Sequence, residues 1–505
     1  MKNLFNSVKL SKPKKNTFDL THDVKFSGKM GNLMPCCIAE AIPGDSFTIG
    51  ADTFLRFAPL IAPVMHRIDV TVHYFFVPNR ILWENWEKFI VNEPTGGLPY
   101  LVMNSTMTAD QKRLADYLGV PPCPVGGTPT AVNALPFSAY QCIYNEYYRD
   151  QNLIAEVPFQ LVDGDNSATF SELTELRKRA WEHDYFTAAL PFAQKGAAVD
   201  IPLGDVALKN NWWQQGKPYF QDDIGSAQNG AVTNVYTPPV DPGIEVNGTP
   251  SAYDPDGTLT VQPTTINDLR RAFRLQEWLE RNARGGTRYI ENILAHFGVY
   301  SSDKRLQRPE YITGTKAPVI VSEVLNTTGE TAGLPQGNMA GHAVSVGEGY
   351  TGKYYVEEHG YIIGIMSVMP KGAYQQGIPK NYLKTEPTEF FWPSFAHIGE
   401  QEVQNQEIYG YGANPTDVFG YIPRYAEYKY IANRVAGDFR TTLDYWHLGR
   451  IFGSQPTLSQ EFIECDSEDV NRIFAVNTTD DTLYIQCLNK IKAVRPMPVF
   501  GTPML

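Results

Sequence analysis

The sequence RIDVTVHYFFVP, residues 67–78, contains the clearest strand of this 505-residue chain. Apolar and polar side chains alternate along it, with Ile68, Val70, Val72, Tyr74 and Phe76 on one side and Asp69, Thr71 and His73 on the other. A period of two is typical of a β-strand that buries one face. Pro78 ends the strand, and the apolar residues after Asn79 recur at helical spacing, namely Leu82, Trp86, Phe89 and Ile90. The stretch therefore predicts a strand followed by a short helix.

Further strands are predicted at both ends of the chain. Period-two patterns begin at Thr17 and recur in the second half, at 318–325, 353–357, 361–369, 427–431 and 482–488. The pair 353–357 and 361–369 is expected to form a hairpin that turns at 359–360. Short helices are predicted between these groups, at 108–118, at 138–147, from Ser171, from Asn267 and at 289–297. This order differs from βαβ alternation and indicates a mainly β, antiparallel sandwich with enlarged loops.

Composition indicates a globular protein with a lightly charged surface. Hydrophobic residues make up 43%, aromatic residues 12% and charged residues 19%. Few charges together with many aromatics are typical of surfaces that neighbouring subunits cover. A large β-rich enzyme with an aromatic core is the alternative on composition alone. The net charge of −12 excludes a broadly basic surface, so a nucleic-acid contact must be local.

The motifs of enzymes and metal sites are incomplete in this sequence. Residues 347–354 approach a phosphate-binding loop, but Tyr354 stands where a Ser or Thr must bind Mg²⁺. Residues 163–174 begin like a Ca²⁺ loop, but Ala168 and Thr174 replace its glycine and its glutamate. We therefore expect no catalytic residue, no cofactor and no metal. We also expect free, buried cysteines, a reducing cytoplasm as the place of synthesis, and no membrane insertion.

Three zones of the chain are locally basic. Residues 1–16 are expected to form a basic arm, with Lys2, Lys9, Lys12, Lys14 and Lys15. Between 421 and 450, basic residues interleave with aromatic ones, namely Arg424, Lys429, Arg434 and Arg440. This pattern suits stacked bases beside phosphates, but the tyrosines can equally be core residues and the arginines can pair with Asp438, Asp444 or Glu427. The third zone is Lys490, Lys492 and Arg495, and we expect nucleic-acid contacts in all three.

Two segments have the composition of surface loops. Residues 218–269 contain no Lys or Arg, seven acidic residues and many turn signals. Residues 326–352 contain seven glycines. We expect both segments to leave the body of the protein as loops.

Several ordered motifs carry a resemblance to a known family. They are FDLTHD (18–23), MGNL (30–33), LRFAPLIAPVMHR (55–67), HYFFVPNR (73–80), WENW (83–86), DYFTAALP (184–191), QKG (194–196), ARGGTRY (283–289) and DFRTTLDYWH (438–447). These stretches are similar to the major capsid protein of Microviridae, in the gokushovirus-like branch. The similarity extends over nearly the whole chain, except for the acidic segment.

The resemblance implies a structural protein and no enzyme. It implies one capsid domain, 17–505, with the fold of an eight-stranded antiparallel jelly-roll sandwich that carries long inserted loops and short helices. Copies of such a chain form a small T=1 icosahedral shell, with pentamers as building blocks, around circular single-stranded DNA. Other virion proteins are further partners. The protein would be assembled in the host bacterial cytoplasm and found in the virion.

The resemblance also implies a surface protrusion, because gokushovirus-like shells carry an inserted loop at their threefold axes. The acidic segment fits this place, and we assign the protrusion to residues 205–266. A host-cell surface receptor would then meet its acidic residues, Asp222, Asp223, Asp241, Glu245, Asp254 and Asp256.

Two other classes of protein compete with a coat subunit. A β-sandwich carbohydrate-binding protein or glycosidase would use the many Tyr and Trp residues in a cleft. An unassembled nucleic-acid-binding protein is the second rival, and the net charge of −12 counts against it.

Overall fold

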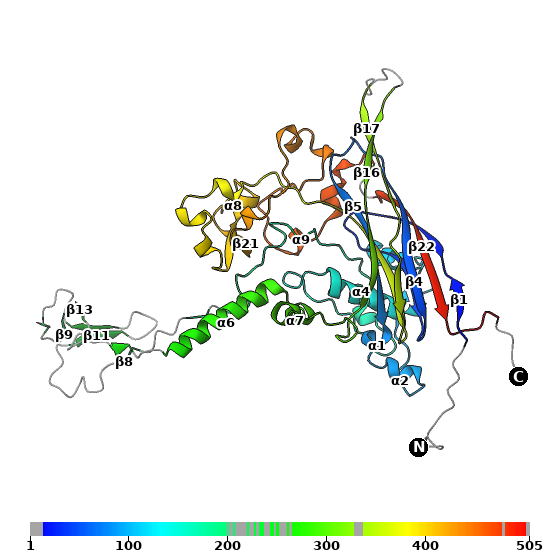
Figure 1. Cartoon of the computed structure of the whole chain (residues 1–505), viewed down its shortest axis with the longest axis horizontal. Coiled ribbons are helices and arrows are strands. Elements are labelled where there is room, and N and C mark those ends of the chain that lie inside the picture. The colour runs from blue at the N-terminus through cyan, green and yellow to red at the C-terminus, as the bar shows by residue number, and fades with distance from the viewer. Residues whose placement is uncertain are drawn as a thin grey trace, which may run out of the picture. The chain divides into compact units, whose positions relative to one another are not determined.

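The computed structural model describes residues 14–197, 199–200, 265–327, 337–476 and 480–500, together with short strand segments between 206 and 261. The protein is mainly β, and its sheets are antiparallel, as the sequence predicts. Two compact units can be distinguished, residues 194–282 and the remainder of the chain. The larger unit contains a sandwich of two sheets (Figure 1).

One sheet contains both ends of the described chain, and we call it the open sheet. Its order is β1-β22-β4-β17-β16, with β2 also beside β22 and β18 also beside β4. The strands are β1 (Asn16–Asp19), β2 (His22–Gly28), β4 (Ser46–Phe57), β16 (Ile320–Leu325), β17 (Met339–Gly347), β18 (Gly352–Tyr355) and β22 (Leu483–Arg495).

The second sheet, which we call the covered sheet, contains the alternating stretch 67–78. Its order is β15-β5-β19-β3, and its strands are β15 (Glu310–Pro318), β5 (Ile68–Pro78), β19 (Gly360–Pro370) and β3 (Met34–Ala41). The pairing of β19 with β5 runs without a break from Gly360 opposite Pro78 to Pro370 opposite Ile68. The predicted strand 67–77 is therefore confirmed, in the middle of this sheet.

The main core lies between the two sheets. The apolar side of β5 faces it, and the open sheet contributes buried side chains such as Phe47, Leu55, Ile485, Cys487 and Ile491. Five of the six cysteines are buried and Cys123 is half-buried, and all six are free thiols. The prediction of free, largely buried cysteines is confirmed.

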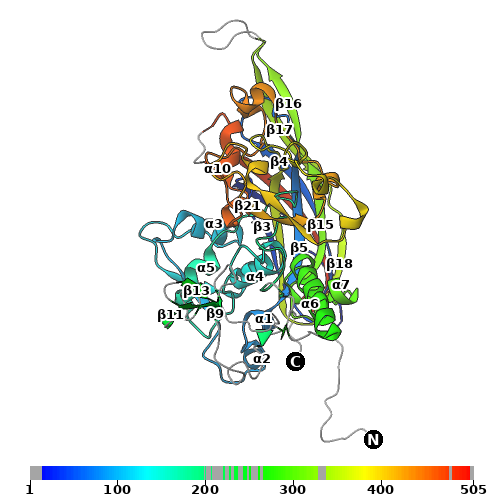
Figure 2. The ribbon, with the colours of Figure 1, turned by 90° about the vertical axis from the view of Figure 1, so that its left-hand side faces the viewer.

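Inserted segments cover the outer face of the covered sheet (Figure 2). They contain α1 (Asn79–Leu82), α2 (Trp86–Ile90), β6 (Tyr100–Met103), α3 (Ala109–Tyr117), β7 (Thr130–Asn133), α4 (Leu135–Ile143), a π-helix (Tyr144–Tyr148) and α5 (Phe170–Thr174). Phe75, Val77, Ile363 and Ile365 point away from the sandwich and pack against these helices in a second apolar core. Both faces of this sheet are therefore buried along much of its length.

The remaining elements lie in the second half of the larger unit and in the smaller unit. The first group has its own small core, to which β20 (Glu400–Gln404), α8 (Asn405–Ile408), β21 (Val418–Pro423) and α9 (Gln460–Ile463) contribute, whereas Val470 of α10 (Ser467–Val470) belongs to the main core. The smaller unit contains β8 (Val206–Ala207), β9 (Phe220–Gln221), β10 (Ala227–Gln228), β11 (Val232–Tyr236), β12 (Gly243–Val246), β13 (Thr249–Ser251), β14 (Thr260–Val261) and most of α6 (Ile266–Gly285). Helix α7 (Tyr289–Phe297) follows in the larger unit and ends at Gly298, whose φ of 66° suits a glycine.

Two strand predictions are wrong, one in its partner strand and the other in its type of secondary structure. The hairpin of 353–357 with 361–369 does not form, because β18 pairs with β4 while β19 pairs with β3 and β5. The chain crosses from one sheet to the other at this point. The predicted strand 427–431 begins instead as a 3₁₀ turn, Ala426–Tyr428. The amides of Lys429 and Tyr430 donate to the Ala426 carbonyl at 2.9 and 3.0 Å, so the backbone there is coiled and not extended.

The helix predictions differ in their outcome. The capping box of Thr108 with Gln111 is confirmed at the start of α3. Ser138 caps no helix, because α4 begins earlier, at Leu135, and the Ser138 hydroxyl is buried and donates to the Phe159 carbonyl at 2.6 Å. The helix expected from Ser171 begins at Phe170 and ends at Thr174.

Two expected loop boundaries also shift. Residues 339–347 of the glycine-rich run are strand β17, since Ala343 and Ser345 are buried against the sandwich. Gly341 is required there, because a Cβ atom would lie 2.4 Å from the Ala62 carbonyl oxygen. At the N-terminus, Asn16 already pairs with Arg495, so the arm expected over 1–16 joins the sheet at its last residue.

Candidate nucleic-acid interface on the open sheet

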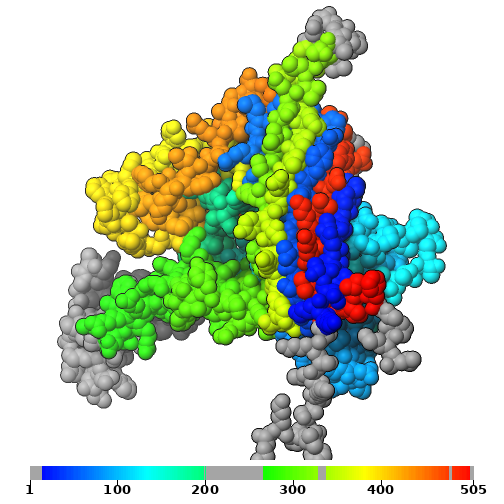
Figure 3. All heavy atoms as spheres, turned by 45° about the vertical axis from the view of Figure 1, so that its right-hand side comes forward, coloured from blue at the N-terminus to red at the C-terminus, as the bar shows by residue number. Residues whose placement is uncertain are grey.

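The outer face of the open sheet is exposed, and strict alternation in β22 decides which side chains it presents. Ile485, Cys487 and Ile491 are buried in the core, whereas Tyr484, Gln486, Lys490 and Lys492 point outward and are exposed. Figure 3 shows β4, β17 and β22 side by side at the surface of the molecule. The face is therefore available to a partner along the length of these strands.

Basic side chains from four strands gather on this face. Lys492 and Lys353 lie on either side of Thr48, because β22 and β18 both pair with β4 at that residue. Arg56 pairs across the sheet with Tyr484, and Lys25 with Gln486. Adjacent strands are about 4.8 Å apart, so Lys353 and Lys492 form one basic cluster, and Arg56 and Lys25 form a second cluster further along β4.

Acidic side chains on the same face are fewer and lie beside lysines. Asp52 forms an ion pair with Lys490, Asp23 forms one with Lys25, and the exposed Asp19 lies opposite Lys492 in the pairing of β1 with β22. Partial burial opposes ionisation of Asp52, but hydrogen bonds from Lys490 and from the Gly349 amide outweigh it and lower the pKa of Asp52. The face as a whole keeps an excess of positive charge.

Aromatic rings lie among these cations. Phe54 is 36% exposed and Tyr484 is 49% exposed. The Arg56 guanidinium lies 5.1 Å from the centre of the Phe54 ring, and the Lys15 ammonium lies 5.3 Å from that of Tyr355. Exposed rings stack on bases, and neighbouring cations meet phosphates, so the arrangement suits single-stranded nucleic acid of any sequence.

The predicted basic residues at the two ends of the chain have different roles. Lys490 and Lys492 belong to the outer face, and Lys14 is exposed just before β1. Lys15 donates to the Gly44 carbonyl at 2.6 Å. Arg495 lies 3.3 Å from the buried Asp45, so its charge is balanced by an ion pair within the fold. Residues Lys2, Lys9 and Lys12 lie outside the described residues.

The zone between 421 and 450 lies on the other side of the sandwich from β22 (Figure 1). Arg424, Lys429 and Arg440 donate to the main-chain carbonyls of Thr388, Arg424 and Val435. Lys429, Arg434 and Arg440 are exposed. Glu427, one of the carboxylates considered as an arginine partner, pairs at 2.8 Å with Lys384, and both side chains are nearly buried. The structure therefore separates this zone from Lys490 and Lys492.

Sequence reasoning missed four residues of the outer face, namely Phe54, Arg56, Lys353 and Tyr484. The signal was present in 46–57, where Phe54 and Arg56 alternate with the buried Leu55 and Phe57. Of the predicted host-facing acids, Glu245 lies on β12, and Asp222, Asp223, Asp241, Asp254 and Asp256 are outside the described residues.

Other kinds of site find no support among the described residues. Their His, Cys, Asp and Glu side chains form no group of three or more that could hold a metal ion. Within the same part of the chain, no helix is long and apolar enough to cross a membrane.

Comparison with known proteins identifies the family. A family described as "Capsid protein (F protein)" matches residues 6–505. The chain belongs to this family of capsid proteins. The capsid protein is also 37% identical to capsid protein VP1 of Bdellovibrio phage phiMH2K, over 97% of its own length and 95% of that relative.

Two further relatives extend the comparison. Capsid protein VP1 of Chlamydia phage 1 is 33% identical, over 100% of this chain and 98% of the relative. Capsid protein VP1 of Spiroplasma virus 4 is 31% identical, over 96% of this chain and 94% of the relative. The resemblance to gokushovirus-like major capsid proteins is therefore confirmed.

Family membership decides between a coat subunit and its two rivals. The capsid protein is a structural, non-enzymatic protein of the virion, and it assembles with other copies of itself. The glycosidase and the unassembled nucleic-acid-binding protein are thereby excluded.

Proposed function

We propose that the capsid protein forms a small T=1 icosahedral shell, built from pentamers, around circular single-stranded DNA, with the open sheet lining the interior. The observation that supports this is the contrast between the two outer faces of the sandwich. Inserted segments cover one of them, while the other presents Lys490, Lys492, Arg56 and Lys353 beside exposed aromatic rings. A shell one subunit thick needs a basic face toward its nucleic acid.

We further propose that eight of the strands form a jelly roll. Numbered along the chain, they are β2, β3, β4, β5, β15, β17, β19 and β22. The open sheet then has the order 1-8-3-6 and the covered sheet 2-7-4-5. Strands that alternate between two antiparallel sheets in this way are what two Greek keys produce. Residues 17–505 would then be one domain, with large insertions after its fourth and seventh strands and an arm before it.

The interior contacts are assigned first to Lys490, Lys492, Lys14 and Lys15 and to the arm lysines Lys2, Lys9 and Lys12. Arg56, Lys353, Phe54 and Tyr484 extend this surface. Arg424, Lys429, Arg434 and Arg440 form a second candidate surface, which ranks lower because it lies on the opposite side of the sandwich. Arg495 supports the surface indirectly, by its ion pair with Asp45.

A matched pair of variants tests which face meets the genome. K490Q/K492Q removes two exposed cations from the open sheet, and K429Q/R434Q removes two from the opposite side. Particles of both variants are examined by electron microscopy and then treated with nuclease. We expect icosahedral particles in both cases, with less protected DNA in K490Q/K492Q alone. The reverse result would place the genome on the other face, and a subunit that stays monomeric in every buffer would contradict the shell itself.

The insertion 205–266 is proposed as the host-facing protrusion, with Asp222, Asp223, Asp241, Glu245, Asp254 and Asp256 exposed to a receptor. Its composition, free of Lys and Arg over 218–269, supports a solvated surface excursion. Deleting 205–266 should leave assembly in the bacterial cytoplasm intact and remove infectivity. Loss of assembly would instead show that the segment, alone or through other virion proteins, holds the shell together.

A further inference from the structure

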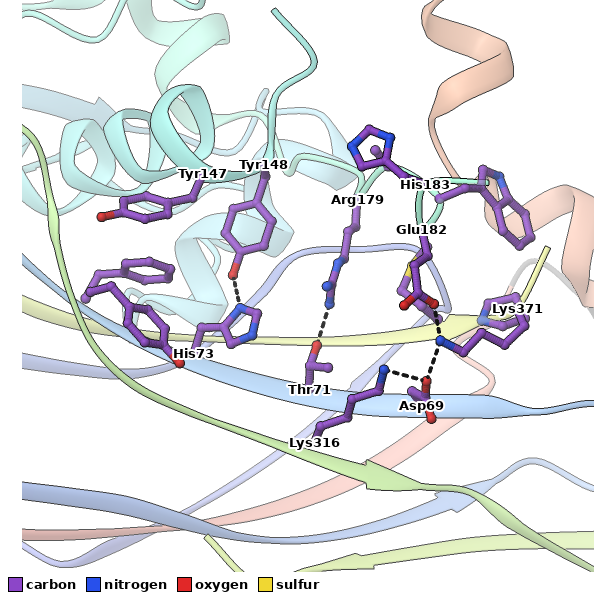
Figure 4. Close-up of a pocket in the computed structure, with 16 residues that line it drawn as sticks. Asp69, Thr71, His73, Tyr147, Tyr148, Arg179, Glu182, His183, Lys316 and Lys371 are labelled. Atoms are coloured by element: carbon purple, nitrogen blue, oxygen red, sulfur yellow. Dashed lines mark hydrogen bonds and ion pairs between the residues drawn. The ribbon is translucent and has the colours of Figure 1, made fainter. Parts of the chain in front are cut away.

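A cavity of about 360 Å³ lies on the outer face of the covered sheet. Its floor is formed by the outward side chains of β5, including Asp69, Thr71 and His73, and its other walls come from the π-helix and from residues 179–183 (Figure 4). Cavities of this size accept small ligands. The cavity lies on the opposite side of the sandwich from the proposed nucleic-acid surface, so its chemistry is independent of that surface.

Arg179 reaches into this cavity from the segment that follows α5 (Figure 4). One terminal nitrogen donates to the Thr71 hydroxyl and, at 2.6 Å, to the Ser367 hydroxyl. These two bonds hold the guanidinium in place but do not balance its charge. Among the residues that the structure describes, no carboxylate forms an ion pair with Arg179.

The other ionic side chains in the cavity balance one another. Lys371 pairs with Glu182 and with Asp69, the latter at 3.1 Å, and Lys316 lies 2.9 Å from Asp69. His73 adds no charge at neutral pH, because burial and the nearby Arg179 charge lower its pKa to about 4. Arg179 therefore leaves the cavity with an uncompensated positive charge.

A second donor in the cavity also lacks an acceptor. The indole N–H of Trp181 is buried, with the side chain 3% exposed, and it has no hydrogen-bond partner among the described residues. Trp181 lines the same cavity as Arg179. A buried donor without an acceptor is destabilising, and the half-buried Arg179 guanidinium has no carboxylate beside it to balance its charge. Two such groups in one hollow indicate a ligand that brings negative oxygen atoms.

We propose that this cavity, the Arg179 cavity, binds a phosphate group. The guanidinium offers a planar fork of donors, which matches two oxygens of a phosphate. A phosphate has a further oxygen for the Trp181 N–H, whereas a carboxylate has only two oxygens in total. Inorganic phosphate or a free nucleotide is one source of this group, and a phosphodiester of nucleic acid is the other.

Calorimetric titration of the purified, full-length protein with inorganic phosphate, at constant ionic strength, tests the proposal. R179Q should weaken phosphate binding at least tenfold, and R179K by less, because it keeps the charge but loses the fork. R305Q is the matched control, since Arg305 is exposed and does not line the cavity. The absence of saturable binding to the unaltered protein, or equal binding by R179Q, would overturn the proposal.

A second variant keeps the test valid if R179Q does not fold. W181F retains the ring and Arg179 and removes one donor, so it should fold and bind phosphate several-fold more weakly. Unchanged phosphate affinity in a folded W181F protein would contradict the role of the indole N–H and, with R179K also unchanged, the site.

Competition assigns the source of the phosphate group. Displacement of inorganic phosphate by dTMP but not by a thymidine dodecamer would assign a free phosphate or nucleotide, and displacement by both would assign a nucleic-acid phosphodiester. Equal displacement by acetate at the same concentration would overturn phosphate in favour of a carboxylate, such as one from a neighbouring copy.

Discussion

The two outer faces of the sandwich differ in burial, although the strands of both sheets pair in the same antiparallel way. Every residue of β19 is buried, because the sandwich covers one side and inserted helices cover the other. In β22, buried and exposed residues alternate almost to its end. A continuous apolar run thus indicates a strand with two buried faces, and strict alternation indicates a strand whose second face is free for partners.

The largest expected effect is on stability, when a phenylalanine is replaced by alanine over the covered sheet and on the open sheet. Phe137 in α4 is 1% exposed and belongs to the core over the covered sheet, whereas Phe54 on the open sheet is 36% exposed. Phe137→Ala should lower the free energy of unfolding by about 3–5 kcal/mol, and Phe54→Ala by less than about 1 kcal/mol. Urea denaturation of the purified subunits measures both. Equal losses would mean that the open sheet is as well packed as the covered one.

Acid should destabilise the covered side through two half-buried histidines. Burial is the main cause that lowers the pKa of His66 and of His73 to about 4. The unfolded chain binds these protons near pH 6.5 and the folded chain near 4, so stability is lost as the pH falls through this window. At pH 5 the loss is on the order of 2 kcal/mol per histidine.

Unfolding free energies at pH 7 and pH 5 measure this effect. H66Q/H73Q should show a smaller difference between the two pH values than the unaltered protein. H22Q, which changes an exposed histidine on β2, is the control and should show the full difference. An unchanged pH dependence in the double variant would contradict the assignment to these histidines.

Basic residues of the open sheet should contribute to the salt dependence of DNA binding. Each phosphate contact with a single strand contributes about 0.7 to the slope of log affinity against log salt, so R56Q/K353Q should lower that slope by about 1.4. Fluorescence titration with a thymidine oligomer at several salt concentrations measures it. An unchanged slope would remove Arg56 and Lys353 from the interface.

The smallest effect is expected at the Lys490 ion pair. D52N frees Lys490 from its carboxylate partner, so affinity for the same oligomer should rise slightly. Stability should change by less than about 1 kcal/mol, because the pair is exposed. Weaker DNA binding by D52N would show that Asp52 positions Lys490 rather than competing with the phosphate for it.

The sequence predicted where strands lie better than how they pair. Alternation located β5, and it located β22 up to residue 488, but the strand continues to Arg495. The same alternation continues there, with the exposed Lys490 and Lys492 on either side of the buried Ile491, although their charge alone groups them with Arg495 as a basic zone. The partners of β18 and β19 depend on contacts with residues hundreds of positions away, which no local pattern contains.

The candidate interface was predicted only in part, for the same reason. Lys490 and Lys492 were found from charge alone, and Arg56 and Lys353 join them only through cross-strand register with Thr48 and Tyr484. Arg495 looked equivalent to its neighbours in the sequence. Its partner, the buried Asp45, lies far away in the chain, and that ion pair could not be anticipated.

The pairing of Asn16 with Arg495 has a practical consequence for engineering this particle. The described chain enters and leaves the open sheet at neighbouring positions, so a peptide joined directly before Asn16 and one joined directly after Arg495 would start from the same rim of that sheet. Fusions at both ends would therefore deliver two cargo modules to one compartment. Display on the opposite surface would require insertion into one of the segments that cover β5 and β19.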